Sequence, residues 1–421
     1  MKTFFVTSIL SLLWCFADAN TLEVCASCEY SSLKAALAEA ADGDEIRVQK
    51  GIYQEGKIIV DKQVHLRGIG WPVLDGNGES EILTVIASGV TVEGFIIKNV
   101  GTSYLEDRAG IRMKRVKDFT IKNNRLLNTF FGIYLEHASD GLVIGNEVIG
   151  EAVEESSSGN AIHLWYCKRI TVENNLARHH RDGIYFEFVD DSLIKNNVSE
   201  DNLRYGLHFM FSNEDDYFKN TFRRNGAGVA VMFSKKINMW ENVFEYNWGK
   251  ASYGMLLKEI YDADIKHNVF RENTIGIYVE GSTRINYLHN DFVRNGWAIK
   301  ISGGCLDNVV SANNFISNTF ELSLKASTNN NTFDGNYWSD YNGYDLDRNG
   351  VGDVPYRPVK LFNYVVNETP EAMVLLRSLF VDLINFSEKV SPVFTPENVI
   401  DNAPAMKRFN HQTNSQQNGG G

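Results

Sequence analysis

Three side chains in two neighbouring stretches of the sequence have the chemistry of a soft-metal site. Residues 204–212 read RYGLHFMFS and residues 226–234 read GAGVAVMFS. Because strand side chains alternate between the two faces, the large apolar residues of these stretches predict a buried face. That leaves His208, Met210 and Met232 on the outer face. An imidazole beside thioether sulfurs is a ligand set that suits Cu(I) and is poor for magnesium or calcium.

Two columns of residues show that these stretches belong to a repeat of about 22 residues. A glycine or alanine precedes each apolar strand, at Gly110, Gly132, Ala161, Gly183, Gly206, Gly228, Gly254, Gly276 and Ala298. An asparagine follows with the same period, at Asn124, Asn146, Asn175, Asn197, Asn220, Asn242, Asn268, Asn290 and Asn314. The two long intervals contain residues 151–160 and 247–252, which indicate inserted loops. Since the repeat carries strand-type alternation, we predict an all-β protein, a single-stranded right-handed parallel β-helix with one coil per repeat.

This register places the candidate metal ligands. The second and fourth residues after each glycine point outward, and adjacent coils lie about 4.8 Å apart. Met210 and Met232 are then direct neighbours, and His208 lies beside Met210 along its strand. His163 lies two coils from His208, at roughly 10 Å. The alternative is that a loop or a partner covers this face and the histidines only make hydrogen bonds, since methionine is also common at interaction surfaces.

The same face offers a rival function, a carbohydrate-active β-helix enzyme such as a polysaccharide hydrolase, lyase or epimerase. Glu136 and Glu187 are expected two coils apart, roughly 10 Å, slightly more than the ~6.5–9.5 Å between the acid and base of an inverting glycosidase. The residues that would assist them or stack on sugar rings are Arg181, Asp182, Tyr134 and Trp165. The carboxylates are not clustered on adjacent coils, so we find no convincing catalytic constellation and expect a protein that is not an enzyme.

The segment DLDRNGVGD, residues 345–353, has the spacing of a calcium loop. The candidate calcium ligands are Asp345, Asp347, Asn349, Val351 and Asp353, with Gly350 at the turning position. Position 12 is Tyr356, where an EF-hand has a bidentate glutamate. The alternative is an Asp/Gly turn whose carboxylates accept hydrogen bonds from backbone amides.

The N-terminus predicts export. Residues 1–19 combine an early lysine, an apolar run too short to span a bilayer and an Ala-Asp-Ala cleavage signal, so we predict a signal peptide. An oxidising compartment favours a disulfide between Cys25 and Cys28. Cys167 and Cys305, six coils apart, are expected to face the core separately. The net charge of −12 argues against a nucleic-acid partner.

The rest of the chain divides into three parts. Residues 20–340 form the predicted β-helix, and Ser31 or Ser32 is expected to cap a short helix that plugs its first coil. Residues 341–406 form a C-terminal extension that contains the calcium-like loop and an amphipathic helix. Residues 407–421 are polar and end in glycine, so we predict a disordered tail.

The C-terminal helix is expected to begin with Thr369 as its N-cap and Pro370 at its first position. It is more apolar than one core-facing stripe needs. We therefore expect that one side caps the last coil and the other binds a partner. The candidate partner-binding residues are Leu375, Leu376, Leu379, Phe380 and Leu383.

Several segments together resemble the NosD family. They are SLKAALAEAADGDEIRV, KGIYQE, RDGIY, RYGLHFMFS, GVAVMFS and YGMLL, followed by NYWSDYNGYDLDRNGVGDVPYRPVKLF. The resemblance runs from about residue 22 to residue 406 and includes SPVFTPENVIDNAPAM near its end. The glycine and asparagine columns are shared with many solenoid proteins, so the specific part is the His-x-Met strand, the second Met strand and the long C-terminal segment.

The resemblance implies a periplasmic protein that helps to mature the copper-sulfide centres of nitrous oxide reductase. Its implied partners are the membrane and ATPase subunits of an ABC transporter, a copper chaperone lipoprotein and the reductase apoprotein. The protein would then lie at the inner membrane through its transporter and handle Cu(I) transiently on His208, Met210 and Met232. The C-terminal helix would be the element that docks on the transporter.

Overall fold

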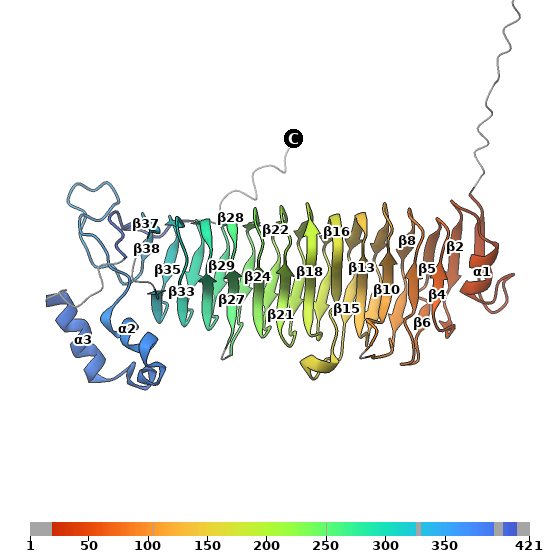
Figure 1. The fold of residues 1–421 in the computed structure, drawn as a ribbon, viewed down its shortest axis with the longest axis horizontal. Coiled ribbons are helices and arrows are strands. Elements are labelled where there is room, and N and C mark those ends of the chain that lie inside the picture. Colours follow the sequence, from red (N-terminus) through yellow and green to blue (C-terminus); the bar gives the residue numbers. More distant parts are fainter. Residues whose placement is uncertain (1–18, 104, 250, 326–329, 391–398, 411–421) are drawn as a thin grey trace, which may run out of the picture.

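The computed structural model describes residues 19–103, 105–249, 251–325, 330–390 and 399–410, and the predicted all-β parallel solenoid is confirmed. The predicted signal peptide, apart from Ala19, and residues 411–421 of the predicted tail lie outside these ranges. Each coil contributes three short strands, and every strand pairs in parallel with its counterpart in the next coil (Figure 1). The stacked coils form a rod with helices at both ends.

The strands form three columns along the rod. The first strands are β4 Ile58–Val60, β7 Leu83–Val85, β10 Ala109–Lys114, β13 Phe131–Glu136, the first half of β16 Ile162–Glu173, β18 Asp182–Asp190, β21 Tyr205–Met210, β24 Ala227–Met232, β27 Tyr253–Lys258, β30 Ile275–Glu280, β33 Trp297–Ile301 and β36 Phe320–Leu324. The second strands are β1 Thr21–Val24, β2 Glu45–Gln49, β5 His65–Ile69, β8 Thr91–Glu93, β11 Thr120–Lys122, β14 Ser139–Ile144, the second half of β16, β19 Leu193–Lys195, β22 Asp216–Phe218, β25 Asn238–Trp240, β28 Tyr261–Lys266, β31 Thr283–Leu288, β34 Val309–Ser311 and β37 Thr332–Asp334. The third strands are β3 Ile52–Tyr53, β6 Val73–Asp75, β9 Ile96–Lys98, β12 Arg125–Leu127, β15 Glu147–Ile149, β17 Leu176–Arg178, β20 Val198–Glu200, β23 Thr221–Arg223, β26 Val243–Glu245, β29 Val269–Arg271, β32 Asp291–Val293, β35 Asn314–Ile316 and β38 Tyr337–Trp338.

The interior of the rod is built from stacks of like residues. In the third strands, the fully buried rings of Phe222, Phe244, Phe270, Phe292, Phe315 and Trp338 follow one another with centroids 4.1 to 5.5 Å apart. The glycine column makes room for them. A side chain at Gly206 would meet the Phe222 ring at 3.1 Å and the carbonyl oxygen of Gly228 at 2.7 Å. Even a Cβ is too crowded at Gly206, so this step needs glycine, whereas the column holds alanine at Ala161 and Ala298.

The predicted asparagine ladder is present, with one residue corrected. Each amide oxygen accepts bonds from the backbone N–H and side-chain NH₂ of the asparagine in the preceding coil, as Asn220 does for Asn197. After Asn290 the ladder continues through Asn313 and not Asn314. Asn314 instead bonds to Asp291 and to Phe409.

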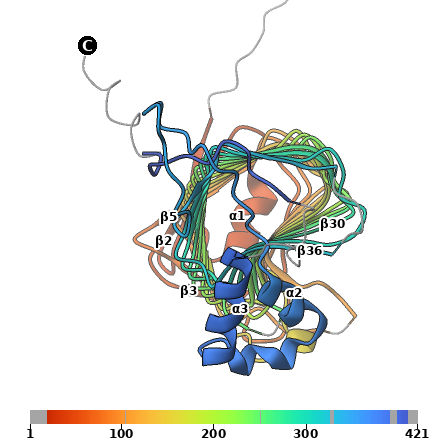
Figure 2. The same cartoon turned by 90° about the vertical axis from the view of Figure 1, so that its left-hand side faces the viewer.

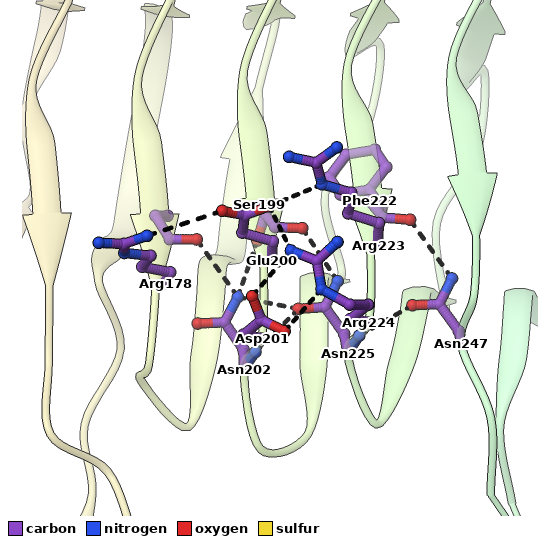
Figure 3. Close-up of polar contacts among 11 residues, drawn as sticks. Arg178, Ser199, Glu200, Asp201, Asn202, Phe222, Arg223, Arg224, Asn225 and Asn247 are labelled. Carbon is purple, nitrogen blue, oxygen red and sulfur yellow. Dashed lines mark hydrogen bonds and ion pairs between the residues drawn. The ribbon is translucent and has the colours of Figure 1, made fainter.

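A second asparagine ladder, which the sequence reasoning missed, lies at the turn after the third strands. It runs through Asn202, Asn225, Asn247, Asn273, Asn295 and Asn318. Beside it, Glu200 accepts bonds from Arg223 at 2.6 Å and Arg224 at 2.8 Å, and Arg224 also forks onto Asp201 (Figure 3). Both polar ladders tie each coil to the next in a fixed register.

Two elements close the ends of the rod. Helix α1, Leu33–Glu39, covers the first coil with Leu33, Ala36 and Leu37 buried. Of the two predicted caps, Ser32 is the N-cap and accepts a bond from Ala35 N. At the other end the asparagine ladder stops at Asp401, which is fully buried. Its carboxylate accepts bonds from the backbone and side chain of Asn336 and from Trp338 Nε1.

The C-terminal helical segment differs from the prediction of one helix starting at Thr369. Helix α2, Leu361–Glu368, ends at Thr369, whose side chain makes no cap bond, and a 3-10 turn η2, Pro370–Leu375, leads to α3, Leu379–Val390. The residue before a proline disfavours the α conformation, so α2 ends there. The chain then turns back, and Val381 of α3 packs with Phe362 of α2.

The insertions of the solenoid share one turn, the connection from a third strand to the next first strand. Longer loops follow β9, β15 and β26, and α2 and α3 come after the last third strand, β38. In Figures 1 and 2 the 3-10 turn η1, Glu155–Ser157, drawn in yellow, lies on the same side of the rod as the blue helices. Within the described ranges, no helix has the length and apolarity needed to cross a membrane.

Past residue 406 the chain stays against the solenoid. Arg408 pairs with Asp291 at 3.2 Å, and Phe409 N donates to Asn314 Oδ1 at 2.9 Å. Residues 407–410, where the sequence predicted the tail to begin, are therefore held in place.

Candidate functional site

The predicted register of the outer face is correct at the candidate metal ligands. Strands β21 and β24 pair with His208 opposite Ala230 and Met210 opposite Met232. The two thioethers are therefore on adjacent strands, and both side chains are half-buried. His208 lies two residues before Met210 on the same strand and face. We call these three residues the His–Met surface.

His208 differs from an ordinary surface histidine because it is buried, with only 6% of its area exposed. The rings of Tyr185 and Tyr205 lie 4.9 and 4.8 Å from its imidazole. Neither ring nitrogen has a hydrogen-bond partner among the described residues. Nδ1 is 3.8 Å from Asp182 Oδ2, which is too long for a hydrogen bond.

A buried ion pair forms one wall of this enclosure. Asp182 is fully buried and receives two bonds from the guanidinium of Arg204, at 2.9 and 2.5 Å. Burial acts to raise the pKa of Asp182, but the His208 and Arg204 side chains outweigh it and hold the pKa below its usual value. Arg204 also lies over the Tyr205 ring, 4.9 Å from its centroid. The side chains around His208 are thereby held in one arrangement.

His163 is in the predicted column but is not brought to His208. The Tyr185 ring lies between them, 4.6 Å from His163 and 4.9 Å from His208. His163 Nδ1 is 3.0 Å from Asn160 Nδ2, which donates to it. Burial lowers the pKa of His163 to about 3, so the ring is neutral. His163 is therefore a buried histidine that makes a hydrogen bond, as in the alternative stated for this face, and His208 is not.

The residues of the His–Met surface fit a soft cation. No three or more His, Cys, Asp or Glu side chains in the described part of the chain are arranged to hold a metal ion. A metal here would depend on the thioethers together with the imidazole. Buried polar groups normally have hydrogen-bond partners, so the two unpartnered nitrogens of His208 need an explanation. A thioether–imidazole set selects Cu(I) over hard cations.

A groove of about 720 Å³ begins one strand away from Met210, on the same outer face. Its floor includes Tyr134, Glu136, Trp165 and Glu187, and the loop before β10 forms one wall. Glu187 pairs with Met210 in register, so the groove and the His–Met surface are continuous.

The groove contains a charged network around Arg112. The guanidinium donates to Glu81 at 2.7 Å, to Glu136 at 3.0 Å and to the carbonyl oxygen of Asp107. It also lies over the Tyr134 ring at 4.4 Å. Burial acts to raise the pKa of Glu81, but its bonds to Thr84 and Arg112 hold the pKa lower.

The arrangement expected for a carbohydrate-active enzyme is only partly present. Glu136 and Glu187 occupy one column with Trp165 between them. However, Glu136 is paired with Arg112 and with Lys114 at 3.5 Å. Asp182, predicted to assist, is buried against Arg204 and does not line the groove.

In the calcium-like loop the carboxylates accept hydrogen bonds from backbone amides, as in an Asx-type turn. Asp345 accepts bonds from Asn349 N and Gly350 N, and Asp353 accepts one from Leu346 N. The donor oxygens are of the hard type that suits calcium. Tyr356, at the position of the missing glutamate, instead donates to Glu321 at 2.6 Å.

The C-terminal segment has one buried and one exposed apolar side. Phe362, Val366 and Val381 pack on Trp297 and Phe320 of the outer face. The exposed side of α3 carries Leu379 at 73%, Phe380 at 54% and Leu383 at 58% exposure. Leu375 is also exposed, and Leu376 packs partly against the buried cluster.

The predicted cysteine chemistry is present. Cys25 and Cys28 form a disulfide, and Cys167 and Cys305 are buried free thiols. Burial raises the pKa of the Cys167 thiol to about 12, so it stays protonated.

Solved structures share the fold. A family 28 exopolygalacturonase of Yersinia enterocolitica aligns with a TM-score of 0.52 at 9% identity, covering 75% of this chain and 79% of that one. The A-module of the mannuronan C-5 epimerase AlgE6 of Azotobacter vinelandii aligns with a TM-score of 0.48 at 17% identity, covering 73% of this chain and 88% of that one. At 9% identity the likeness to the exopolygalacturonase concerns the fold alone.

Sequence relatives are closer. A protein of Pseudomonas aeruginosa named probable ABC transporter binding protein NosD is 31% identical over 399 residues, covering 89% of this chain and 93% of the relative. A protein of the same name from Stutzerimonas stutzeri is 31% identical over 381 residues, covering 86% of each chain. The family model described as periplasmic copper-binding protein (NosD) matches residues 90–202 and 150–343. The chain belongs to the NosD family.

Proposed function

We propose that this protein is a periplasmic maturation factor for the copper-sulfide centres of nitrous oxide reductase, and that it carries Cu(I) on the His–Met surface. The observation that supports this most is His208, a buried imidazole whose two nitrogens lack partners, beside two thioethers in register. The description of the family as copper-binding agrees with this chemistry.

The three ligands have different roles in this proposal. Met210 and Met232 are half-buried, so they are the donors that an incoming Cu(I) meets first. His208 is enclosed and supplies a stronger nitrogen donor behind them. Copper is the cargo here, received from a chaperone lipoprotein and passed to the reductase apoprotein. Thioether ligation of this kind is soft enough to hold Cu(I) and to be displaced by a partner's ligands.

The partner side of the proposal rests on the relatives' name and on the exposed apolar face of α3. The relatives are named ABC transporter binding proteins. Leu379, Phe380 and Leu383 form a large unpartnered apolar surface among the described residues, and such surfaces mark interaction sites. We propose that this surface docks on the membrane subunits of the transporter and holds the protein at the inner membrane. The ATPase subunits of the transporter would lie below those membrane subunits.

An anaerobic Cu(I) titration against a competing chelator tests the copper proposal. The triple variant His208→Ala, Met210→Ala, Met232→Ala is expected to lose binding that the wild-type protein shows. The matched control is Met373→Ala, which removes an exposed thioether far from the surface. Equal Cu(I) binding by wild type and triple variant, with both folded by circular dichroism, would refute the assignment.

A second experiment tests docking. Leu379→Ser and Leu383→Ser together replace exposed apolar side chains without disturbing the buried Val381 contact. Co-purification with the transporter subunits should be lost. The control Glu371→Gln changes an exposed residue of the same segment and should leave co-purification intact. Retained co-purification of the double variant would mean that α3 serves only as a cap.

A further inference from the structure

The groove contains an internal example of cation recognition. The Arg112 guanidinium lies over the Tyr134 ring and donates to Glu81 on one side and Glu136 on the other. An aromatic face between two carboxylates is an arrangement that favours a guanidinium, because the cation is attracted by the ring and by both anions.

The next two coils place a second aromatic ring between two carboxylates, of which Glu136 is already paired with Arg112 and Lys114 and Glu187 has no cation among the described residues. Trp165 pairs in register with Glu136 on one neighbouring strand and with Glu187 on the other. The Trp165 ring is half-buried and lines the groove. Glu187 forms no ion pair with any residue that the structure describes, and its nearest polar contact is the Tyr185 hydroxyl at 3.5 Å.

The charge balance of the groove points the same way. Its lining holds six acids, Glu79, Glu81, Glu106, Asp107, Glu136 and Glu187, and four bases, Lys57, Arg108, Arg112 and Lys114. All four bases are paired with groove carboxylates. Within the described chain this leaves the carboxylates of Glu79, Asp107 and Glu187 without an ion-pair partner, and they line a cavity large enough for an extended peptide segment.

We propose that the groove binds an extended, arginine-bearing segment of a partner protein, with one guanidinium over the Trp165 ring between Glu136 and Glu187. This function is separate from copper binding and does not depend on it. Because Glu187 pairs with Met210, a bound segment would hold its protein within one strand spacing of the His–Met surface. The groove would therefore position whichever partner exchanges copper there.

Binding of labelled tetra-arginine to the full-length mature protein, followed by fluorescence anisotropy, tests the proposal. Trp165→Leu and Glu187→Gln should each weaken binding by about three- to fivefold, as expected for partly exposed cation–π and ion-pair contacts. The matched control Glu280→Gln lies in the same outward column, outside the groove, and should bind as the wild type does. Binding should also weaken with added salt.

Competitors identify the ligand chemistry. Tetralysine and spermine should compete more weakly than unlabelled tetra-arginine, because an ammonium lacks the planar face that stacks on indole. Four outcomes would overturn the proposal: no tetra-arginine binding at low salt, equal loss in Glu280→Gln, equal competition by spermine, or stronger binding of a neutral oligosaccharide. Each variant is first compared with wild type by circular dichroism and thermal unfolding, so that a folding defect is not mistaken for lost binding.

Discussion

Asp401 closes the asparagine ladder, and replacing it with alanine should loosen the last coil. Its carboxylate accepts five hydrogen bonds, from Gly335 N, Ala403 N, Asn336 N, Asn336 Nδ2 and Trp338 Nε1, at 2.9 to 3.2 Å. Asp401 and Asn336 are fully buried and Trp338 nearly so. Water therefore has little access to replace the lost acceptor.

The cost follows from the donors left behind. An unsatisfied buried donor costs about 1–3 kcal/mol, and three of the five donors belong to Asn336 and Trp338. Allowing for relaxation, Asp401→Ala should lower the local unfolding free energy by about 3–5 kcal/mol. Asp401→Asn should lower this free energy less, by about 1–2 kcal/mol. In the rest of the ladder an asparagine oxygen accepts the same pair of bonds, as Asn336 does from Asn313.

Native-state hydrogen exchange measures this effect residue by residue. Solenoid coils contact mainly their neighbours, so protection should fall at the amides of Gly335 and Asn336 and stay unchanged at Asn242, four coils away. Asp353→Ala, which removes an exposed carboxylate from the same extension, is the control. Unchanged protection of Asn336 in Asp401→Ala, or a uniform loss along the whole rod, would refute the reasoning.

Three further predictions concern the core and its titrating groups. Burial raises the pKa of Glu321 from 4.5 to about 7, so the folded state holds its proton more tightly. Stability at the α2 junction should therefore fall by up to about 3 kcal/mol as the pH rises from about 4.5 to about 7. Glu321→Gln should flatten this pH dependence in melts between pH 5 and 8. Burial lowers the pKa of His163 from 6.5 to about 3, so stability should be lost as the pH falls below about 6.5. Urea unfolding at pH 4 and pH 7.5 should show a smaller loss of stability in His163→Gln than in the wild type. An unchanged loss would contradict this. Phe270→Ala removes one ring from a fully buried stack whose neighbouring rings lie 4.7 and 5.0 Å away. It should lower the unfolding free energy measured in urea by about 3–5 kcal/mol. A loss under about 1 kcal/mol would mean that the stack collapses to fill the gap.

The repeat and its register could be predicted because they follow from strand geometry alone. Side chains alternate with period two and coils stack at one strand spacing, so the glycine column was enough to place Met210 opposite Met232. The one-residue error at Asn314 arose where two asparagines are adjacent and the period cannot separate them. The second ladder, at Asn202, Asn225 and Asn247, has a similar period that was visible in the sequence and was overlooked.

The environment of the site could not be predicted in the same way. The burial of His208 depends on the Tyr185 and Tyr205 rings and on the Asp182–Arg204 pair, which meet only in three dimensions. The helix expected from Thr369 reads as continuous in its apolar pattern. In the structure its first part is the 3-10 turn η2, and only Leu379–Val390 is α-helical, with Val381 packed into the cluster of Trp297 and Phe320.

The constant spacing of the coils also fixes the distances between the surfaces along the rod. Eight strand spacings separate β13, at the groove, from β36, where α2 packs, which is about 38 Å. Three spacings separate Met232 from the strand of Trp297, about 14 Å. The insertions lie at one turn and the ladders lock every step, so these intervals change only by whole coils. Removing one repeat between them would bring the His–Met surface about 4.8 Å closer to α2 and α3 while leaving both surfaces intact.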